Sequence, residues 1–469
     1  MTKAQDISGI IAQRQPLARK LGDIETRLNT LCQSLGRLEQ ERQRQLQQWS
    51  GESETTSKLQ NLTLTEFEQR VREELTTLHR LKARFSRNTL NIGVIGSMGQ
   101  GKSTLLQSLT GLTNQVIPAF PGKACTAARS KISHQDGRST EARIDFHSHD
   151  SFLREVILPY YDKLGLEPKP SSFEAFASSP LPSLPSEDDH TQTNIYNRLK
   201  NDYRRHTDQY REYLGREPLR VQDESQISSY VAQDYDKDNQ LVNYQCLAVK
   251  SVEIYCSFPV HEIGAIALID VPGLGDFRLG DESLVIEALG QEVDFILFMY
   301  KPSKDRANFE QRDTQLYNLA SKALNNLSRR SIFVLNADSN GENQEGCRSL
   351  KQDLDSNAVR MPVLESVIAD CSSPEEANTR VLETVLNQLR TNITELDQAY
   401  AQEKIQSLDS SLQALKGDLE AAQSILPKIS HNTIIKQYFR KFDEFWNVIT
   451  NELEKLMGEL IENRDTPDE

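Results

Sequence analysis

The feature that most constrains the fold is a glycine-rich loop between an apolar run and a helical run, "NIGVIGSMGQGKSTLLQSLTGL", residues 91–112. Gly96, Gly101, Lys102 and Ser103 fit the spacing GxxxxGK[ST], with a predicted strand before the loop and a predicted helix after it. Glycines let consecutive backbone N–H groups turn inward, and the helix N-terminus adds its positive dipole end. The stretch therefore predicts a site that binds the phosphates of a nucleotide.

Individual residues of the loop have separate expected roles. Lys102 is expected to reach the β and γ phosphates and the Ser103 hydroxyl to bind magnesium, the expected cofactor, while Gln100 is a candidate for the hydrolytic step. The expected nucleotide-binding residues of the loop are Gly96, Ser97, Met98, Gly99, Gln100, Gly101, Lys102, Ser103 and Thr104.

A second motif, "AIALIDVPGLGDF", ends a predicted buried strand in Asp270 and places Gly273 three residues later. An aspartate there holds magnesium through water, and the Gly273 N–H approaches a γ-phosphate because no side chain intervenes. Between the two motifs, in "PGKACTAARSKI", Thr126 is the best-placed hydroxyl for the same ion, with an ordinary loop threonine as the alternative. The expected metal ligands are Ser103, Thr126 and Asp270, and the expected catalytic residues are Lys102, Thr126 and Gln100.

From about residue 90 the chain alternates short apolar runs with helical stretches. The runs "NIGVIG", "LAVKSVEIYCSF", "AIALID", "DFILFMY", "SIFVLN" and "LESVIAD" are predicted strands. Strands that alternate with helices favour an α/β fold, a mostly parallel sheet with helices on both faces. Residues 150–245 contain "SSPLPSLPSEDD" and a Tyr/Arg-rich helical stretch, and we expect a helical insertion that is partly disordered.

Helices with apolar seams flank this region. Residues 17–38 carry leucines and one isoleucine at alternating spacings of four and three, residues 67–85 form a second amphipathic pattern, and residues 405–422 repeat the heptad. Pro427 interrupts the pattern before another predicted helix over residues 431–462. We expect N-terminal stalk helices at 1–88, a nucleotide-binding domain at 89–393 and C-terminal stalk helices at 394–469. The heptads leave open whether the helices pair within one chain or between chains.

Charge and composition indicate which classes of partner and which location the sequence favours. The formal net charge is −14, which argues against nucleic acid as a partner because phosphate backbones attract clustered Lys and Arg. No apolar stretch approaches the roughly 20 residues that span a bilayer, and no N-terminal signal of the charged-then-apolar type is present. The six cysteines lie far apart without metal-ligand spacing, as in reduced cytosolic proteins. The expected location is cytoplasmic.

The two motifs, together with "VKSVEIYCSFP" before the second, resemble the bacterial branch of the dynamin-like GTPases. The resemblance covers about residues 90–393. It implies a large GTPase on a helical stalk built from both chain ends, hydrolysis of GTP to GDP and phosphate, and homodimers or higher oligomers formed through the GTPase domain and the stalk. It further implies peripheral contact with a membrane, here at its inner face, and in many members membrane remodelling.

The base-recognition stretch departs from the family pattern. Such GTPases read guanine with NKxD or TKxD, whereas "FVLNADSN" offers Asn336, then Ala337 in place of lysine, with Asp338 one position early. We expect Asn336 and Asp338 to contact the base, with GTP as the ligand. ATP, bound by a P-loop ATPase of the coiled-coil type, is the alternative.

Two further departures concern hydrolysis and membranes. Animal and plant relatives carry Gln then Ser in the middle of the phosphate loop, where this chain has Met98 and Gly99, and Leu274 cannot orient water. Hydrolysis then depends on a partner subunit, a cation held otherwise, or Gln100. No apolar membrane-inserting tip is present, so the sequence is a shorter member, works through a partner, or is the N-terminal part of something longer. A nucleotide-gated coiled-coil scaffold with little hydrolysis is the remaining alternative.

Overall fold

The computed structural model divides the chain into two compact units. Met1–Ser8 and Asn88–Ile393 form the α/β unit, and Gly9–Arg87 with Thr394–Glu469 form the helical unit. The residues described are 3–48, 60, 64–97, 99–117, 129–135, 137–184, 190–231, 241–259, 265–270, 286, 289–290, 292–303, 308–324, 326–425, 440, 443–444 and 446–448. The division of the chain into residues 1–88, 89–393 and 394–469 stays a prediction.

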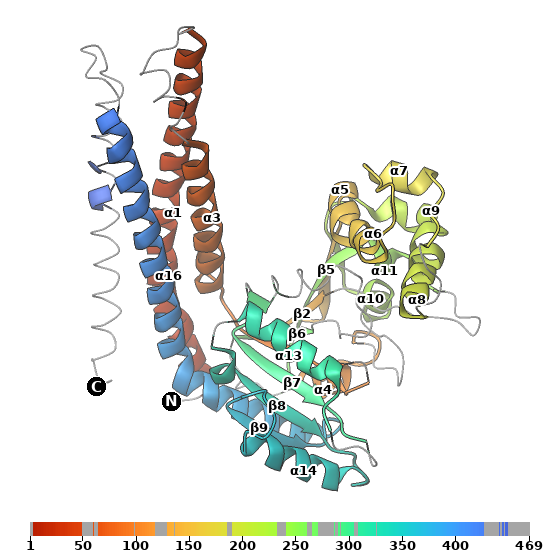
Figure 1. The fold of residues 1–469 in the computed structure, drawn as a ribbon. Helices are drawn as coiled ribbons and strands as arrows, with labels where there is room; N and C mark the ends of the chain where they lie inside the picture. The colour runs from red at the N-terminus through yellow and green to blue at the C-terminus, as the bar shows by residue number, and fades with distance from the viewer. Residues whose placement is uncertain are drawn as a thin grey trace, which may run out of the picture. The chain divides into compact units, whose positions relative to one another are not determined.

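A single sheet organises the α/β unit, and in the residues described it has nine strands in the order β4-β3-β5-β2-β6-β1-β7-β8-β9 (Figure 1). The strands are β1 (Leu90–Ile95), β2 (Arg129–His134), β3 (Glu141–Phe146), β4 (Leu219–Val221), β5 (Val249–Cys256), β6 (Ile266–Asp270), β7 (Phe295–Tyr300), β8 (Ser331–Asn336) and β9 (Glu365–Ala369). β1 pairs in parallel with β6 and β7, and the parallel pairing continues through β8 to β9. β2 pairs antiparallel with β6, and β3 pairs antiparallel with β5 and β4. The predicted α/β fold with a mostly parallel sheet is confirmed.

Every residue of β1, β7 and β8 is buried, so both faces of this part of the sheet are covered. On one face, α13 (Gln311–Ala323) and α14 (Gln344–Asp355) pack over a cluster that includes Phe298, Phe333 and Leu335. α4 (Lys102–Thr110) contacts β6 and the π-helical turn η6 (Ala377–Leu382), which follows the short helix α15 (Pro374–Glu376). This central part of the sheet holds the phosphate loop.

The insertion after β3 forms a helical body with its own core. Its elements are α5 (His149–Phe152), η1 (Leu153–Ile157), α6 (Leu158–Leu164), α7 (Phe173–Ser178), α8 (His190–Arg198), η2 (Leu199–Arg204), α9 (Thr207–Tyr210), η3 (Arg211–Tyr213), α10 (Glu224–Val231) and α11 (Gln245–Ala248). Figure 1 shows these helices gathered near β5. Phe152, Tyr203 and Tyr210 are fully buried, with ring centroids 5.3–6.5 Å apart.

The insertion over residues 150–245 was expected to be partly disordered, and the structure describes helices, turns and one short strand over residues 149–184 and 190–231. The Tyr/Arg-rich stretch is polar in composition, but its aromatic rings recur at helical spacing and are buried in the core of the insertion. Residues 185–189 of the Pro/Ser-rich segment lie outside the described part of the chain.

In the described residues, three long helices lie side by side in the helical unit: α1 (Lys3–Gln48), α3 (Leu64–Phe85) and α16 (Glu383–Ile425) (Figure 1). Their seams meet in one apolar core within the chain, including Leu21 and Leu28 of α1, Leu81 of α3 and Leu408 of α16. The described apolar positions of these patterns therefore face a core within the chain. Most of the helix predicted over residues 431–462 lies outside the described residues.

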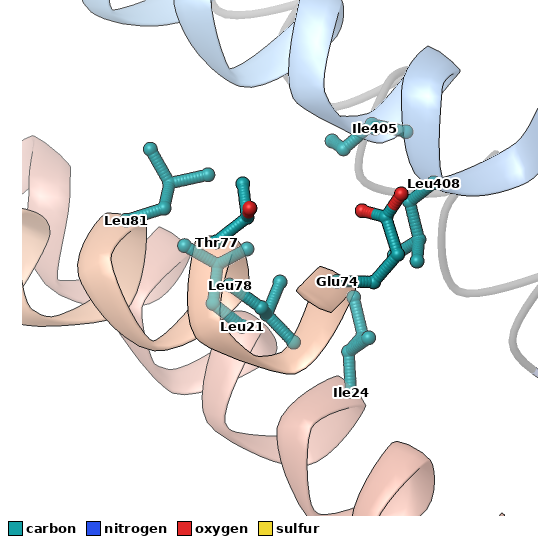
Figure 2. Close-up of a pocket in the computed structure, with 8 residues that line it drawn as sticks. All are labelled: Leu21, Ile24, Glu74, Thr77, Leu78, Leu81, Ile405 and Leu408. Atoms are coloured by element: carbon teal, nitrogen blue, oxygen red, sulfur yellow. The ribbon is translucent and has the colours of Figure 1, made fainter. Parts of the chain in front are cut away.

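An apolar opening lies between these helices (Figure 2). Its lining is Leu21, Ile24, Glu74, Thr77, Leu78, Leu81, Ile405 and Leu408. The Glu74 carboxylate lies beside Leu408 and accepts a hydrogen bond of 2.8 Å from the Ser411 hydroxyl, which ties α3 to α16. The opening is a packing gap of the helical unit rather than a polar site.

Candidate nucleotide site

The phosphate loop connects β1 to α4, and two of its positions favour glycine because of close neighbours or a positive φ. A Cβ at Gly96 would lie 2.5 Å from the Met299 carbonyl oxygen of β7. A Cβ at Gly101 would lie 2.2 Å from Asn336 Nδ2, and Gly101 has φ +94°, which favours glycine. Both positions therefore allow the loop to pass close to the neighbouring strand ends.

The N-terminus of α4 supplies the expected anion-binding groups. Gly101 is the N-cap residue and provides no side-chain hydrogen bond to the first turn. The first N–H groups of a helix lack intrahelical partners, and together with the helix dipole they attract phosphate. Leu105, Leu106 and Leu109 are buried and hold the other end of α4 in the core.

The Lys102 side chain folds over the loop. Its Nζ donates hydrogen bonds to the carbonyl oxygens of Gly96 (2.8 Å) and Ser97 (3.2 Å). The Ser97 hydroxyl donates a 3.0 Å hydrogen bond to Asp313 of α13, and burial raises the pKa of that carboxyl. The loop is thus held by hydrogen bonds from Lys102 to its own carbonyl groups and by the hydrogen bond from Ser97 to Asp313 of α13.

Asp270 is the last residue of β6, lies beside Val94 of β1 in the sheet register, and is 2% exposed. Because β1 and β6 are parallel, this carboxylate emerges at the same sheet edge as the phosphate loop. Ser103 is the second residue of α4 at that edge. A hydroxyl and a carboxylate are hard oxygen donors of the kind that suits magnesium. Thr104, the third residue of α4, also lies in this first turn.

Asn336, at the end of β8, connects three segments. Its Nδ2 donates to the Gln100 carbonyl oxygen (3.1 Å), and its Oδ1 accepts from the Cys371 N–H (3.1 Å) in the loop after β9. Asn336 is 6% exposed. Asn336 was predicted to contact the base, and the structure shows its amide holding the phosphate loop against the loop after β9.

The Gln100 side chain is directed to the end of β7. Its Oε1 accepts a short hydrogen bond from the Lys301 N–H, while its carbonyl oxygen accepts from Asn336. Both ends of this residue therefore connect the loop to neighbouring strands. Its role in hydrolysis stays a prediction.

Asp338 lies at the rim of the same edge. Its Oδ1 is 2.6 Å from Lys301 Nζ, with side-chain exposures of 30% and 39%. The Asp338 N–H donates to Asn343 Oδ1 (2.7 Å). The sequence reading missed Lys301, because Lys301 and Asp338 are brought together only by the parallel pairing of β7 and β8.

Of the predicted site residues, the structure brings Gly96, Ser97, Gly99, Gln100, Gly101, Lys102, Ser103, Thr104, Asp270, Asn336 and Asp338 to one sheet edge. Met98, Thr126 and Gly273 lie outside the described residues.

A glycine-rich loop between the central strand of a mostly parallel sheet and a helix N-terminus defines a P-loop nucleotide-binding protein. The sequence model of the dynamin family matches residues 92–338, more than half of the chain. The chain therefore belongs to the dynamin family, and the matched region is a GTPase domain.

Solved structures also match the chain. Two come from an oligomerised bacterial dynamin pair described as providing a mechanism for the long-range sensing and tethering of membranes. They are each 18% identical to this chain and cover 90% and 94% of it, with TM-scores of 0.39 and 0.37. The chain spans 63% and 64% of the length of those proteins. No curated protein matches the sequence. In the described part of the chain, no helix is long and apolar enough to cross a bilayer.

Proposed function

We propose that the protein hydrolyses GTP to GDP and phosphate in the P-loop site. One observation carries the proposal: the Gly101 turn and the N-terminus of α4, which begins with Lys102, follow β1, and Asp270 ends the neighbouring parallel strand β6. This arrangement combines backbone donors, one cation and one carboxylate at a single sheet edge. It suits a nucleotide whose phosphates enter with a divalent cation.

Magnesium is the cofactor that these donors fit. Ser103 and Asp270 would hold it, with Thr126 as a further ligand, and it would neutralise charge on the phosphate oxygens. Lys102 would exchange its two loop carbonyl partners for β- and γ-phosphate oxygens. The Gly273 N–H would contact the γ-phosphate.

In the proposed reaction, a water oxygen bonds to the γ-phosphorus and the bond from that phosphorus to the β–γ bridging oxygen breaks. Gln100 does not offer its side-chain oxygen to this water in the structure, since the oxygen is engaged by Lys301. We infer that a second subunit supplies the group that orients the water. This predicts a turnover that rises with protein concentration.

The helical unit suits a role in self-assembly coupled to the nucleotide state. α16 begins in the α/β unit at Glu383 and continues through the helical unit to Ile425, so one helix belongs to both. We propose dimerisation through the GTPase domain, assembly through the helical unit and peripheral contact with the inner face of a membrane from the cytoplasm. Family membership supports this part of the proposal.

The test measures phosphate release from GTP and from ATP over a range of protein concentrations, with and without anionic liposomes. The proposal expects release from GTP that grows faster than linearly with protein and disappears in Lys102→Ala. Tight GTP binding without release would instead support a nucleotide-gated scaffold, which the engaged Gln100 side chain favours. Equal competition by ATP would support an ATPase, which the displaced Asp338 favours. Light scattering of the same mixtures would report assembly. Scattering that changes with neither nucleotide nor liposomes would contradict the proposed membrane contact.

A further inference from the structure

The ion pair between Lys301 and Asp338 lies at the rim of the P-loop site. Lys301 directly follows β7 and Asp338 follows β8 by two residues, and these strands are neighbours in parallel register, with Tyr300 beside Leu335. The Lys301 Nζ to Asp338 Oδ1 distance is 2.6 Å. Both side chains remain partly exposed, at 39% and 30%, so a ligand can reach them.

Both members of the pair have a fixed backbone. The Lys301 N–H is bound by the side chain of Gln100, a residue of the phosphate loop. The Asp338 N–H is bound by Asn343 Oδ1, and Asn343 Nδ2 donates to the carbonyl oxygens of Pro302 and Asn336, each at 3.0 Å. Asn343 is 1% exposed, so one buried amide positions the residue after Lys301 and the strand end before Asp338. The pair is therefore pre-organised relative to the phosphate loop.

Position 337, where the usual base-recognition stretch carries lysine, cannot supply a cation. It is alanine, and Ala337 packs against the apolar cluster beneath α13 and α14. The ammonium of Lys301 comes instead from the neighbouring strand. Burial raises the pKa of the Cys347 thiol on α14 and of the Cys371 thiol in the loop after β9, and the nearby Lys301 charge opposes this rise at both.

The chemistry of the pair suits guanine. Guanine presents N–H donors at N1 and at the exocyclic N2 next to the O6 acceptor, so a carboxylate accepts from the donors while an ammonium donates to O6. Adenine presents an acceptor at N1, which faces a carboxylate unfavourably.

We propose that Lys301 is a specificity-determining residue that replaces, from β7, the lysine absent at position 337, and that it reads guanine together with Asp338. This inference rests on the proposed nucleotide function of the same site. It assigns Lys301 to the base and leaves the phosphates to the loop.

The experiment measures calorimetric affinities of the full chain for GDP, IDP, ADP and tripolyphosphate in the presence of magnesium. IDP lacks only the exocyclic amine of guanine, and tripolyphosphate lacks the base. The variants are Lys301→Met, Lys301→Arg and Asp338→Asn. Lys169→Met is the matched control, because Lys169 forms a comparable surface ion pair, 2.5 Å from Asp162 at 43% exposure, in the helical insertion.

We expect the wild type to bind GDP about tenfold more tightly than ADP and more tightly than IDP. Lys301→Met lowers GDP affinity about tenfold and reduces the GDP/ADP ratio, while tripolyphosphate affinity stays unchanged. Lys301→Arg retains most of the preference, and Lys169→Met behaves as the wild type. In the Asp338→Asn background, Lys301→Met has less than about a twofold further effect, since paired groups are not additive.

An unchanged GDP/ADP ratio in Lys301→Met would overturn the inference and leave the proposed function in place. An equal loss of GDP, ADP and tripolyphosphate would also overturn it, because Lys301 would then act on the phosphate loop through Gln100. A wild-type chain that binds none of the four ligands would reject the proposed function and this inference together.

Discussion

The Arg14 guanidinium lies against the Asp397 carboxylate, with Nη2 2.5 Å and Nε 2.8 Å from Oδ2, although 383 positions separate the two residues in the chain. Arg84 approaches the other carboxylate oxygen at 3.6 Å. All three residues are at most 4% exposed. One aspartate of α16 thus joins α1 to α3 inside the helical unit.

Asp397→Asn is expected to lower the free energy of unfolding of the helical unit by about 3–5 kcal/mol, because it leaves two buried guanidinium groups without their carboxylate. Urea unfolding followed by circular dichroism measures the change. Asp409→Asn is the control, since Asp409 accepts an exposed i,i+4 hydrogen bond from Gln413 on the surface of α16. Equal midpoints for the two variants would contradict the assigned role.

Glu25 of α1 makes the stability of the helical unit depend on pH. Burial alone would raise its pKa, but hydrogen bonds from Lys82 (2.7 Å) and His79 (2.8 Å) of α3 lower it below the usual value of a glutamate. A lowered carboxyl pKa adds stability above the unfolded value, and this stability is lost as pH falls through the folded pKa. Glu25→Gln should therefore reduce Tm at pH 7 and reduce it much less at pH 3.5. A constant Tm difference would exclude this linkage.

Asn336→Ala should separate the phosphate loop from the loop after β9. It leaves the Gln100 carbonyl oxygen and the Cys371 N–H without their present partner, at about 1–3 kcal/mol for each buried group. We expect a lower Tm of the α/β unit and weaker binding of both GDP and tripolyphosphate. Asn392→Ala, which removes a local hydrogen bond on α16, serves as the control. A loss confined to GDP would show that Asn336 contacts the base instead.

Gly101→Ala should abolish phosphate binding. The φ of +94° strains any L side chain by about 1–2 kcal/mol, and the added Cβ would lie 2.2 Å from Asn336 Nδ2. Gly165→Ala tests strain alone, because Gly165 has φ +61° in open space at the end of α6. Tripolyphosphate affinity, measured by calorimetry, should fall only in Gly101→Ala. Similar tripolyphosphate affinities of Gly101→Ala and Gly165→Ala would mean that the loop binds phosphate without its glycine.

Much of this fold could be predicted from local sequence patterns. All six predicted strands are present, because apolar runs such as residues 295–300 are buried on both faces wherever they lie in the sheet. β2, β3 and β4 were not predicted: "RSKISH" and "EARIDF" are interrupted by charged and polar residues, and β4 has only three residues. All three exist because a neighbouring strand offers hydrogen-bond partners, which no local pattern records.

The candidate site also contains residues that the sequence predicts and residues that it does not. The phosphate loop is contiguous, so its glycines, Lys102 and Ser103 were readable from spacing. Lys301 and the bridging role of Asn336 depend on which strands are neighbours and on the residues at the carboxyl end of each strand. The side-chain direction of Gln100 depends on a hydrogen bond to a residue 201 positions further along the chain, and spacing carries no signal for it.

β4, one of the two edge strands that the sheet has in the described residues, also limits how copies of the protein can join. It is three residues long, and its Arg220 extends to a 2.8 Å ion pair with Glu141 on β3. A short edge strand that carries charge is a poor template for another strand, and it discourages edge-to-edge aggregation. Oligomers that grew by extending the sheet from the β4 side would therefore be disfavoured.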